Sequence, residues 1–193
     1  MKAIIDAQSF KNAIEKTKKF VSKNSYNLLM KYIHIVVDAK SQEVLFEALD
    51  GHRFSRAYTK LLQADESFEC FIGTNIPKIE RHDISAEIEC DGDRVLVTVG
   101  DGIMGYRQPE GKFFDLEKIA NPETEPVVKL GVNGKLMAEA LNSVKDLSTT
   151  CNLSRLYIYG PKDPVFIRSN EKDVAGVLPL NVNWDRYESG GIN

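Results

Sequence analysis

The stretch ALDGHRFS, residues 48–55, places Asp50, His52 and Arg53 within four positions. An aspartate beside a histidine can form the base half of a hydrolytic triad, in which the carboxylate orients an imidazole that activates a nucleophile. The chain has no Gly-x-Ser-x-Gly elbow or other nucleophile motif to complete such a triad. Asp-Gly is also favoured in tight turns for backbone reasons alone. We therefore predict a turn here, and keep a hydrolase that uses His52 as a third hypothesis, for which the sequence names no substrate.

Metal and cofactor chemistry have little support in the sequence. The histidines stand alone without His-x-x-x-His spacing, and the cysteines form no Cys-x-x-Cys pair. The glycines of VGDGIMGY fall at a turn between two expected strands and do not precede a helix, as a phosphate-binding loop requires. We expect no bound metal and no cofactor. The residues concerned are His34, His52, His82, Cys70, Cys90 and Cys151.

Basic residues recur on the expected helices, although the net charge of the whole chain is -3. On one helix, such lysines are as easily explained by a solvated face. On three helices that lie on one side of a sheet, they would form a basic surface suited to sequence-independent contact with phosphates. The candidate DNA-binding residues are Lys11, Lys16, Lys18, Lys19, Lys23, Lys78, Arg81, Lys135 and Lys145.

The hydrophobic patterns predict three units with the same order of elements, β-α-β-β-β. The first has a strand at 2–7, a helix opened by Gln8 or Ser9 and running to residue 23, and strands at 28–39, 43–50 and 53–61. The second has strands at 68–73, 85–90, 94–100 and 102–108, with a short or broken helical turn at 74–83. A polar segment at 110–126 reads as a linker. The third has a strand at 127–132, a helix at 133–146, and strands at 155–160, 164–169 and 175–182.

These units predict an α+β fold with repeated units and helices on one face. We expect a complete domain over residues 1–122, made of two units, and a third unit with a C-terminal tail over 123–193. An odd number of units leaves a sheet edge unpaired within the chain, which favours a homo-oligomer.

The composition is that of an ordinary globular protein, with 42% hydrophobic and 27% charged residues. No run approaches the roughly 18 apolar residues of a membrane span, and the N-terminal segment turns polar after a few residues. An odd number of unpaired cysteines fits a reducing compartment. We expect a cytoplasmic protein that does not enter the membrane.

The order of units and several short motifs resemble the bacterial processivity sliding clamps, the DNA polymerase III beta subunit. Asp-Gly-His-Arg followed by the apolar Phe54, after VVDAKSQEVLFEAL, looks like the middle domain of that clamp. RVLVTVGDGIMGYRQPEGKFFDLEKI looks like the end of the same domain, with Phe114 where the family has a proline. VKLGVNGKLMAEALNSV and AGVLPLNV look like the second half of the last domain. The resemblance covers nearly the whole chain in a shortened form. The usual clamp chain has three domains of two such units each and closes a ring as a dimer, so a ring of twelve units would need four chains of the present kind.

The resemblance implies a hydrophobic groove that captures short peptides from polymerases and other partners. Two or three side chains buried there would each contribute about 1.5 to 3 kcal/mol, concentrated in a few anchors. Any one of the leucines, taken alone, is better explained as ordinary core. Trp184 and Tyr187 in the tail could cover or extend the groove. The peptide-binding candidates are Leu49, Gly51, His52, Phe54, Phe114, Lys118, Ile119, Leu136, Leu178, Pro179, Leu180 and Val182.

The leading hypothesis is a non-enzymatic, sliding-clamp-like factor in DNA replication or repair, with duplex DNA and clamp-binding peptides, such as those of a DNA polymerase, as partners. The alternative is a monomeric peptide-binding adaptor or clamp antagonist that keeps the groove but does not encircle DNA. The oligomeric state separates the two, because only a clamp must associate to close a ring.

Overall fold

The computed structural model describes residues 1–121, 123–144, 153–169 and 173–184. The chain divides into two compact units, Met1–Asn121 and Pro122–Asn193. We call them unit 1 and unit 2, and each is described by itself. Unit 1 contains the first and second of the predicted β-α-β-β-β repeats, which we call its two halves, and unit 2 contains the third. Lys145, Cys151 and Tyr187, which carried predictions, lie outside the described residues.

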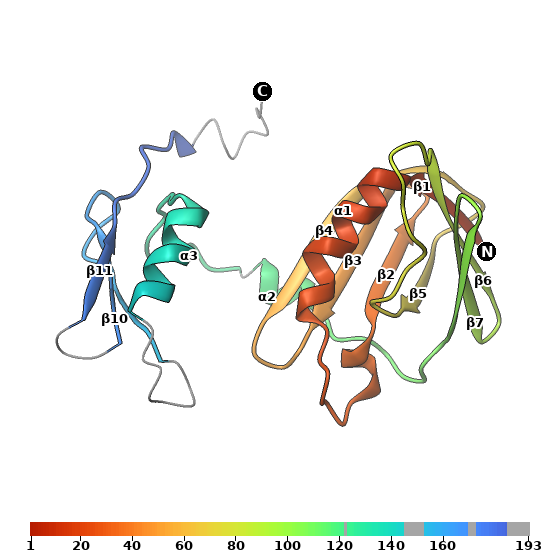
Figure 1. Cartoon of the computed structure of the whole chain (residues 1–193), viewed down its shortest axis with the longest axis horizontal. Helices are drawn as coiled ribbons and strands as arrows, with labels where there is room; N and C mark the ends of the chain where they lie inside the picture. Colours follow the sequence, from red (N-terminus) through yellow and green to blue (C-terminus); the bar gives the residue numbers. More distant parts are fainter. Residues whose placement is uncertain (122, 145–152, 170–172, 185–193) are drawn as a thin grey trace. The chain divides into compact units, whose positions relative to one another are not determined.

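Unit 1 is one antiparallel sheet of eight strands with a helix across one face (Figure 1). The strand order is β5-β2-β3-β4-β1-β6-β7-β8. This is the α+β class that the sequence predicts. The elements are β1 (Lys2–Asp6), α1 (Ala7–Thr17), two short 3-10 helices (Lys18–Phe20 and Leu28–Lys31), β2 (Ile33–Asp38), β3 (Glu43–Leu49), β4 (Phe54–Ala64), β5 (Phe68–Ile72), β6 (Ser85–Asp91), β7 (Arg94–Val99), β8 (Gly102–Arg107) and α2 (Glu117–Ala120).

The two halves of unit 1 exchange their first strands. β1, from the first half, pairs with β6 of the second half, with Ile4 opposite Glu87. β5, from the second half, pairs in turn with β2 of the first half, with Ile35 opposite Cys70. β1 also pairs with β4 on its other side, so that it lies between strands of both halves. The two halves consequently share one core, and neither half of unit 1 forms that core by itself.

Helix α1 begins two or three residues earlier than the sequence suggested, because Asp6 is its cap and not Gln8 or Ser9, and it ends at Thr17 and not at residue 23. The Asp6 carboxylate accepts a hydrogen bond of 2.8 Å from the Ser9 amide, which satisfies one of the free N–H groups of the first turn. Hydrogen bonds from Ser9 lower the pKa of Asp6. The helix then buries one face at the spacing of a 3.6-residue period, through Phe10, Ala13, Ile14 and Thr17.

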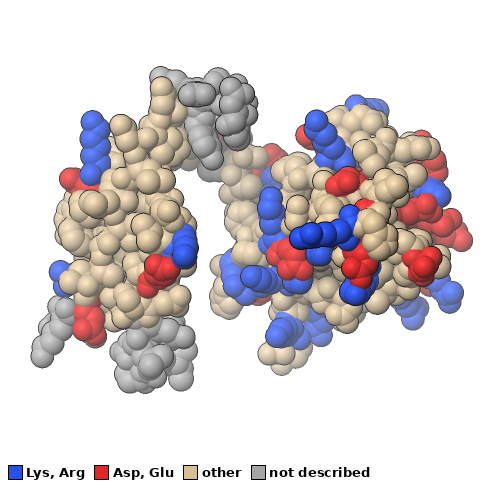
Figure 2. Space-filling model, turned by 45° about the horizontal axis from the view of Figure 1, so that its top comes forward, with Lys and Arg blue, Asp and Glu red and all other residues tan. Residues whose placement is uncertain are grey.

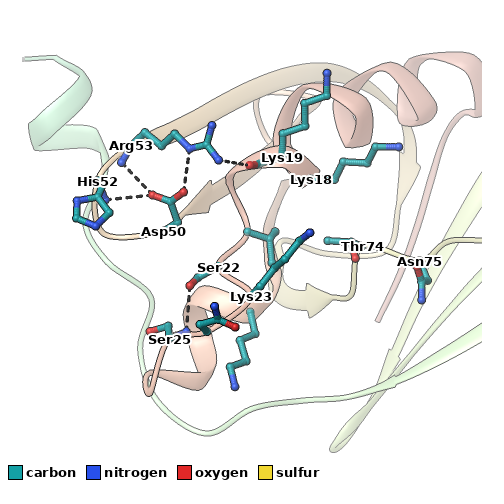
Figure 3. Close-up of a pocket in the computed structure, with 13 residues that line it drawn as sticks. Lys18, Lys19, Ser22, Lys23, Ser25, Asp50, His52, Arg53, Thr74 and Asn75 are labelled. Atoms are coloured by element: carbon teal, nitrogen blue, oxygen red, sulfur yellow. Dashed lines mark hydrogen bonds and ion pairs between the residues drawn. The ribbon is translucent and has the colours of Figure 1, made fainter. Parts of the chain in front are cut away.

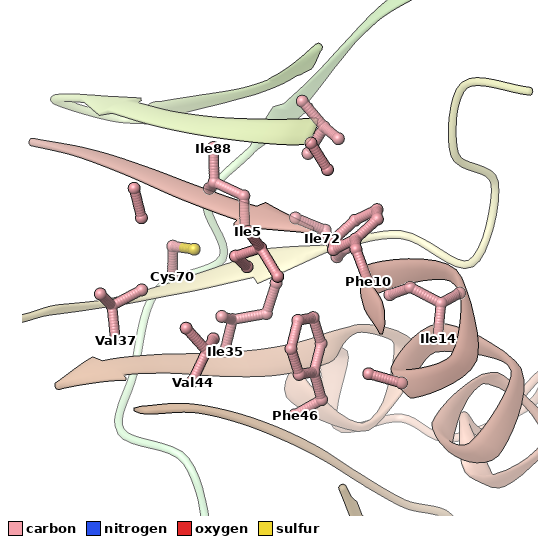
Figure 4. Close-up of a cluster of buried hydrophobic side chains, with 14 of the residues drawn as sticks. Ile5, Phe10, Ile14, Ile35, Val37, Val44, Phe46, Cys70, Ile72 and Ile88 are labelled. Atoms are coloured by element: carbon pink, nitrogen blue, oxygen red, sulfur yellow. The ribbon is translucent and has the colours of Figure 1, made fainter. Parts of the chain in front are cut away.

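That face meets the sheet in a large apolar core (Figure 4). The Phe10 and Phe46 rings meet edge to face, with centroids 5.7 Å apart. Strand residues of both halves complete the cluster, among them Ile5, Ile35 and Ile88, all fully buried. The core therefore joins α1 to strands that are far apart in sequence.

The segment 74–83 contradicts the prediction of a helical turn. It runs without helix, with Pro77 and Ile79 buried. Pro77 has no N–H for a helical ladder. The segment is held instead by side chains: Asp83 accepts from the Glu80 amide at 2.7 Å, and Gln8 of α1 donates to the Glu80 carbonyl at 2.8 Å. Helix formation is replaced by docking against α1.

The segment 110–126 is more than the linker that its composition suggested. Phe113 and Leu116 are buried in a second small cluster with Leu29 and Phe71, and α2 follows directly. The first part of this segment therefore belongs to the packed body of unit 1.

The free side of β5 is partly closed by a side chain. The Gln108 amide donates to the Phe71 carbonyl and its oxygen accepts from the Phe71 N–H, both at 2.8 Å. The Tyr106 hydroxyl donates to the Asn75 carbonyl just beyond β5. Gln108 thereby takes the two hydrogen bonds that a neighbouring strand would make at Phe71.

Unit 2 contains α3 (Gly134–Ser143) and a small sheet of β9 (Arg155–Tyr157), β10 (Val165–Arg168) and β11 (Val174–Val177), in the order β11-β10-β9. Its buried cluster among the described residues is Val144, Ile167 and Val177. The predicted strand 127–132 forms only a single bridge, between Gly131 and Leu180, where the Leu180 amide donates to the Gly131 carbonyl at 2.8 Å. No described strand lies on its other side, so no ladder forms.

No helix in the described part of the chain is long and apolar enough to cross a membrane.

Candidate functional site

The end of α1 opens into a basic cleft of about 1180 Å³ in unit 1 (Figure 3). Three segments line it: residues 18–31 after α1, the Asp50–Arg53 turn, and the start of the 74–83 segment. We call this site the basic cleft. Its lining residues are Lys18, Lys19, Val21, Ser22, Lys23, Asn24, Ser25, Lys31, Asp50, His52, Arg53, Thr74 and Asn75.

The cleft carries an excess of positive charge. Asp50 is the one carboxylate in its lining, and it is already paired with Arg53. Lys18 pairs with Glu15, one turn back on α1. Among the described residues, no carboxylate lies within ion-pair distance of Lys19, Lys23 or Lys31. These three exposed lysines can therefore each take a phosphate oxygen without breaking an existing pair.

The Asp-Gly-His-Arg stretch is a turn that braces the cleft. The Asp50 carboxylate accepts hydrogen bonds of 3.1 Å from the amides of His52 and Arg53, and Gly51 adopts a φ of 92°. Only glycine takes such a φ without strain. Arg53 then links the turn to the chain after α1: its Nε donates to Asp50 Oδ2 at 2.8 Å and its terminal nitrogen donates to the Lys19 carbonyl at 2.9 Å.

This geometry does not support a catalytic Asp50–His52 pair. The Asp50 carboxylate is occupied by Arg53 and by backbone amides, and the hydrogen bond from the Arg53 side chain lowers the pKa of Asp50. The His52 imidazole is exposed and makes no hydrogen bond within the described residues. The turn prediction is therefore confirmed. The hydroxyls among the described lining residues are those of Ser22, Ser25 and Thr74.

The remaining DNA-binding candidates are spread over three places. Lys11 and Lys16 are exposed on α1, and Lys11 donates to the Ile79 carbonyl at 3.3 Å, beside the segment that carries Lys78 and Arg81. Lys78 pairs with Glu80, which offsets its charge. Lys78 and Arg81 thus lie near α1 but not on a helix. Lys135 is exposed on α3 of unit 2, and Lys145 lies outside the described residues.

The unit 1 candidates for peptide binding gather around the second small cluster. Leu49 packs against it, and Phe114 meets the buried Phe113 edge to face at 5.8 Å. Phe54 lies opposite Leu49 across the turn and is 37% exposed, and Ile119 on α2 is 60% exposed. Lys118 pairs with Asp115 at 3.3 Å, while Gly51 and His52 are exposed at the turn itself. Unit 1 therefore presents exposed apolar side chains here beside a buried apolar cluster.

A buried polar network holds α2 against that surface. His34 lies between Glu47 and Glu69, at 3.2 and 3.3 Å, and its ring packs against those of Phe71 and Phe113, with centroids 4.9 and 4.5 Å away. Arg56 donates to Glu47 at 2.8 Å and also pairs with Glu117 of α2. The short helix is thus tied through Arg56 to β3 and β4.

The unit 2 candidates fall in two groups. Pro179, Leu180 and Val182 line a hollow of about 440 Å³ together with Trp184, so the predicted contribution of the tail begins at that residue. Leu136 and Leu178 are outside the lining of this hollow and are 52% and 73% exposed.

Several cleft residues were not among the predicted site residues. Lys31, Thr74 and Asn75 come from segments that the sequence presented as strand or helix, and only the tertiary fold brings them to the end of α1. One signal for the cleft was present in the sequence: Asp50 and Arg53 lie three positions apart, with a turn glycine between them. Such spacing allows the ion pair that the structure contains.

Among the described residues, no group of three or more His, Cys, Asp or Glu side chains is placed to hold a metal ion. Cys70 and Cys90 are free and buried. Burial raises the pKa of the Cys70 thiol far above its usual value, so it is neither a nucleophile nor a ligand in this state.

No family model and no curated protein matches the sequence. Solved structures match it closely in fold. The DNA polymerase sliding clamp of Bacillus subtilis superposes with a TM-score of 0.78 at 20% identity, over 93% of this chain and 49% of that one. The beta subunit of Streptococcus pyogenes gives a TM-score of 0.78 at 16% identity, over 92% and 50%. The DNA polymerase III beta subunit of Thermotoga maritima gives 0.72 at 15% identity, over 93% and 51%.

The chain spans about half the length of these clamps. Identities at this level establish the fold and leave the activity open. The chain therefore has the fold of the DNA polymerase III beta sliding clamps, in a shortened form.

Proposed function

We propose that this protein is a non-enzymatic, sliding-clamp-like factor of DNA replication or repair that contacts duplex DNA without sequence preference. The observation that carries the proposal is the basic cleft, because it adds three unpaired lysines to the exposed lysines of α1 in a chain with a clamp fold. Backbone phosphates are the partner that such a surface fits, and base-reading geometry is not required.

The proposal extends to partner peptides and to self-association. Phe54, Phe114 and Ile119 of unit 1, and Leu178 of unit 2, supply exposed apolar anchors of the kind that capture short peptides, with the clamp-binding motif of a DNA polymerase as the expected ligand. A homo-oligomer in the reducing cytoplasm would complete the assembly, without metal or cofactor.

The DNA contact is tested by charge reversal in the cleft. We expect the triple variant Lys19→Glu, Lys23→Glu, Lys31→Glu to weaken duplex binding at low salt and to reduce the slope of log K against log salt by up to about 0.9 per lost phosphate contact. The matched control reverses Lys40, Lys60 and Lys112, which are exposed lysines outside α1 and the cleft. Equal binding by both variants, or no binding by the unmodified chain at low salt, would contradict the proposal.

Encirclement is tested separately by retention on circular DNA. A ring that surrounds the duplex is retained on a closed circle and lost when the circle is cut, whereas side-on binding is indifferent to the cut. Equal retention on circular and linear DNA would rule out a ring and leave a DNA-contacting surface.

A second candidate function is a peptide-binding adaptor or clamp antagonist that does not encircle DNA, and the exposed apolar surface around Phe54 favours it. Under that function, Phe54→Ala would lower the affinity for a clamp-binding peptide while DNA has no effect on it. A chain that stays monomeric at micromolar concentration would favour the adaptor.

A further inference from the structure

Unit 2 leaves much apolar surface uncovered. In the view of Figure 2 it shows few charged side chains, and helix α3 has no buried residue. Strand β9 and the residues around it contribute further large apolar side chains to the surface. The most exposed of these unit 2 residues are Val127, Leu136, Leu153, Leu156, Tyr159, Leu178 and Leu180.

Helix α3 follows the pattern of α1, yet its apolar face is only partly covered: Met137 and Ala140 pack against the buried cluster of unit 2, whereas Leu141 stays exposed. Asn133 caps α3 as Asp6 caps α1. Counted from these caps, Leu141 occupies the position of Ile14. Ile14 is 1% exposed, whereas Leu141 is 37% exposed. The part of the apolar face of α3 around Leu141 therefore lacks the cover that Ile14 has in unit 1.

In unit 1, strands of both halves cover the corresponding face of α1. Helix α1 contacts β3 and β4 of its own half and also β6 of the other half. The contact with β6 exists because β1 pairs with β6, so that the second half covers one side of α1. In the described part of unit 2, no strand stands in the place of β6.

Unit 2 nevertheless carries both edges needed for such a pairing. In unit 2, Gly131 forms a β-bridge with Leu180, which follows the last strand. In unit 1, Ile4 of β1 is paired in the same way with Gln63 of the last strand of its half, β4. The segment 127–132 therefore occupies the position of β1. Its residues 127–130 form no β-ladder, and Val127 is fully exposed. β9 is likewise the outer strand of its sheet, in the position of β2 and β6.

We propose that two copies of this chain complete each other through unit 2. The segment 127–132 of each copy pairs antiparallel with β9 of the other, as β1 pairs with β6 and β5 with β2 within unit 1. The exposed face of α3, around Leu141, is then covered by the β9 strand of the second copy.

A second copy is the occupant because unit 2 is complementary to itself. Each copy offers one donor segment and one acceptor edge, so a two-fold axis satisfies both at once and leaves neither open. Unit 1 demonstrates that two such halves of this chain's own design pack into one continuous sheet. Any other partner would need to supply a donor strand and an acceptor edge in the same spacing.

The test measures self-association of the full chain by sedimentation over a range of protein concentrations. We expect a dimer whose dissociation constant rises at least about tenfold with Leu156→Lys on β9, or with Val128→Lys in the donor segment. Leu62→Lys is the matched control, because Leu62 in β4 of unit 1 is 56% exposed and Leu156 is 54% exposed. The control should leave the dissociation constant unchanged.

Hydrogen exchange locates the contact independently. Amides of residues 127–132 and 155–157 should exchange more slowly at high than at low protein concentration, while amides of β2 and β3 should not change. Val128→Lys keeps the test valid if Leu156→Lys fails to fold, because Val128 forms no strand pairing with any described residue.

The inference rests on the self-association in the proposed function and not on DNA contact. It is overturned by a chain that remains monomeric with no concentration-dependent protection. It is equally overturned by an oligomer that neither unit 2 substitution weakens, which would place the contact on another surface, such as the open edge of β8. The triple lysine variant of the basic cleft should still dimerise, so loss of DNA binding and loss of dimerisation can be told apart.

Discussion

At the scale of single residues, Arg53 is the side chain that gives the Asp-Gly-His-Arg stretch its role. It connects the Asp50 carboxylate with the Lys19 carbonyl, and its guanidinium lies 5.1 Å from the centre of the Phe20 ring. Residues whose types could support catalysis therefore serve here to hold the Asp50–Arg53 turn beside the end of α1. Of the cleft lysines, Lys19 is the one whose backbone this brace holds directly.

The Asp50 contacts predict a pH dependence of stability. Since the pKa of Asp50 is lowered in the folded protein, the contacts stabilise the fold above the unfolded pKa of about 3.9. That stability is lost as the pH falls through the folded pKa. Urea unfolding at pH 6 and at pH 3 should show that Asp50→Asn loses about 0.5 to 1 kcal/mol less on acidification than the unmodified chain, since the pair is partly exposed. An identical loss in both proteins would show that Asp50 does not contribute.

The buried thiols give a second prediction at this scale. Because Cys70 is buried and its pKa is raised, a Cys151→Ser variant should react with a thiol reagent only when urea unfolds unit 1. Cys90 is also buried, and burial raises its pKa as well. Labelling of either thiol at the rate of a free cysteine under native conditions would contradict the described core.

At the scale of elements, local patterns and tertiary packing have separable roles. Helix α1 and the β2–β3 and β6–β7 hairpins follow from periodicity and turn residues, and the sequence predicts them. The 74–83 segment is extended because Pro77 and Ile79 are drawn into the core of unit 1. The basic cleft was only half foreseen for the same reason, since Lys31 and Thr74 meet α1 through packing and not through spacing.

The network around Arg56 is the element-scale feature most open to mutation. Arg56→Met leaves the buried Glu47 without its charged donor, so we expect a loss of about 3 to 5 kcal/mol of unfolding free energy. The control is Arg107→Met, because Arg107 pairs with Asp93 on the exposed surface, where a pair contributes about 0 to 1 kcal/mol. Urea unfolding measures both, and equal losses would show that the Arg56 network is not buried in solution.

At the scale of the whole molecule, the two units differ in the size of their cores. Unit 1 has a large shared core, whereas the described buried cluster of unit 2 consists of Val144, Ile167 and Val177. A small core gives little stability unless another surface covers it. The chain thus combines a self-sufficient domain with a unit that gains most from association.

This difference predicts two unfolding transitions. We expect the transition of unit 2 to come first and to rise with protein concentration, because binding to the folded state stabilises it by mass action. The transition of unit 1 should not depend on concentration. Hydrogen exchange in urea, followed separately for the amides of each unit, would distinguish the two transitions. A single concentration-independent transition would contradict both expectations.

The two outer edges of the eight-stranded sheet differ, because the side chain of Gln108 covers part of the β5 edge. With Gln108 occupying the backbone groups of Phe71, a strand approaching from that side would first have to displace it, while β8, the outer strand at the other end, has no described strand beside it. Sheets that are open at both ends can polymerise without limit. We therefore expect that a strand adding to this sheet would pair with β8 and not with β5.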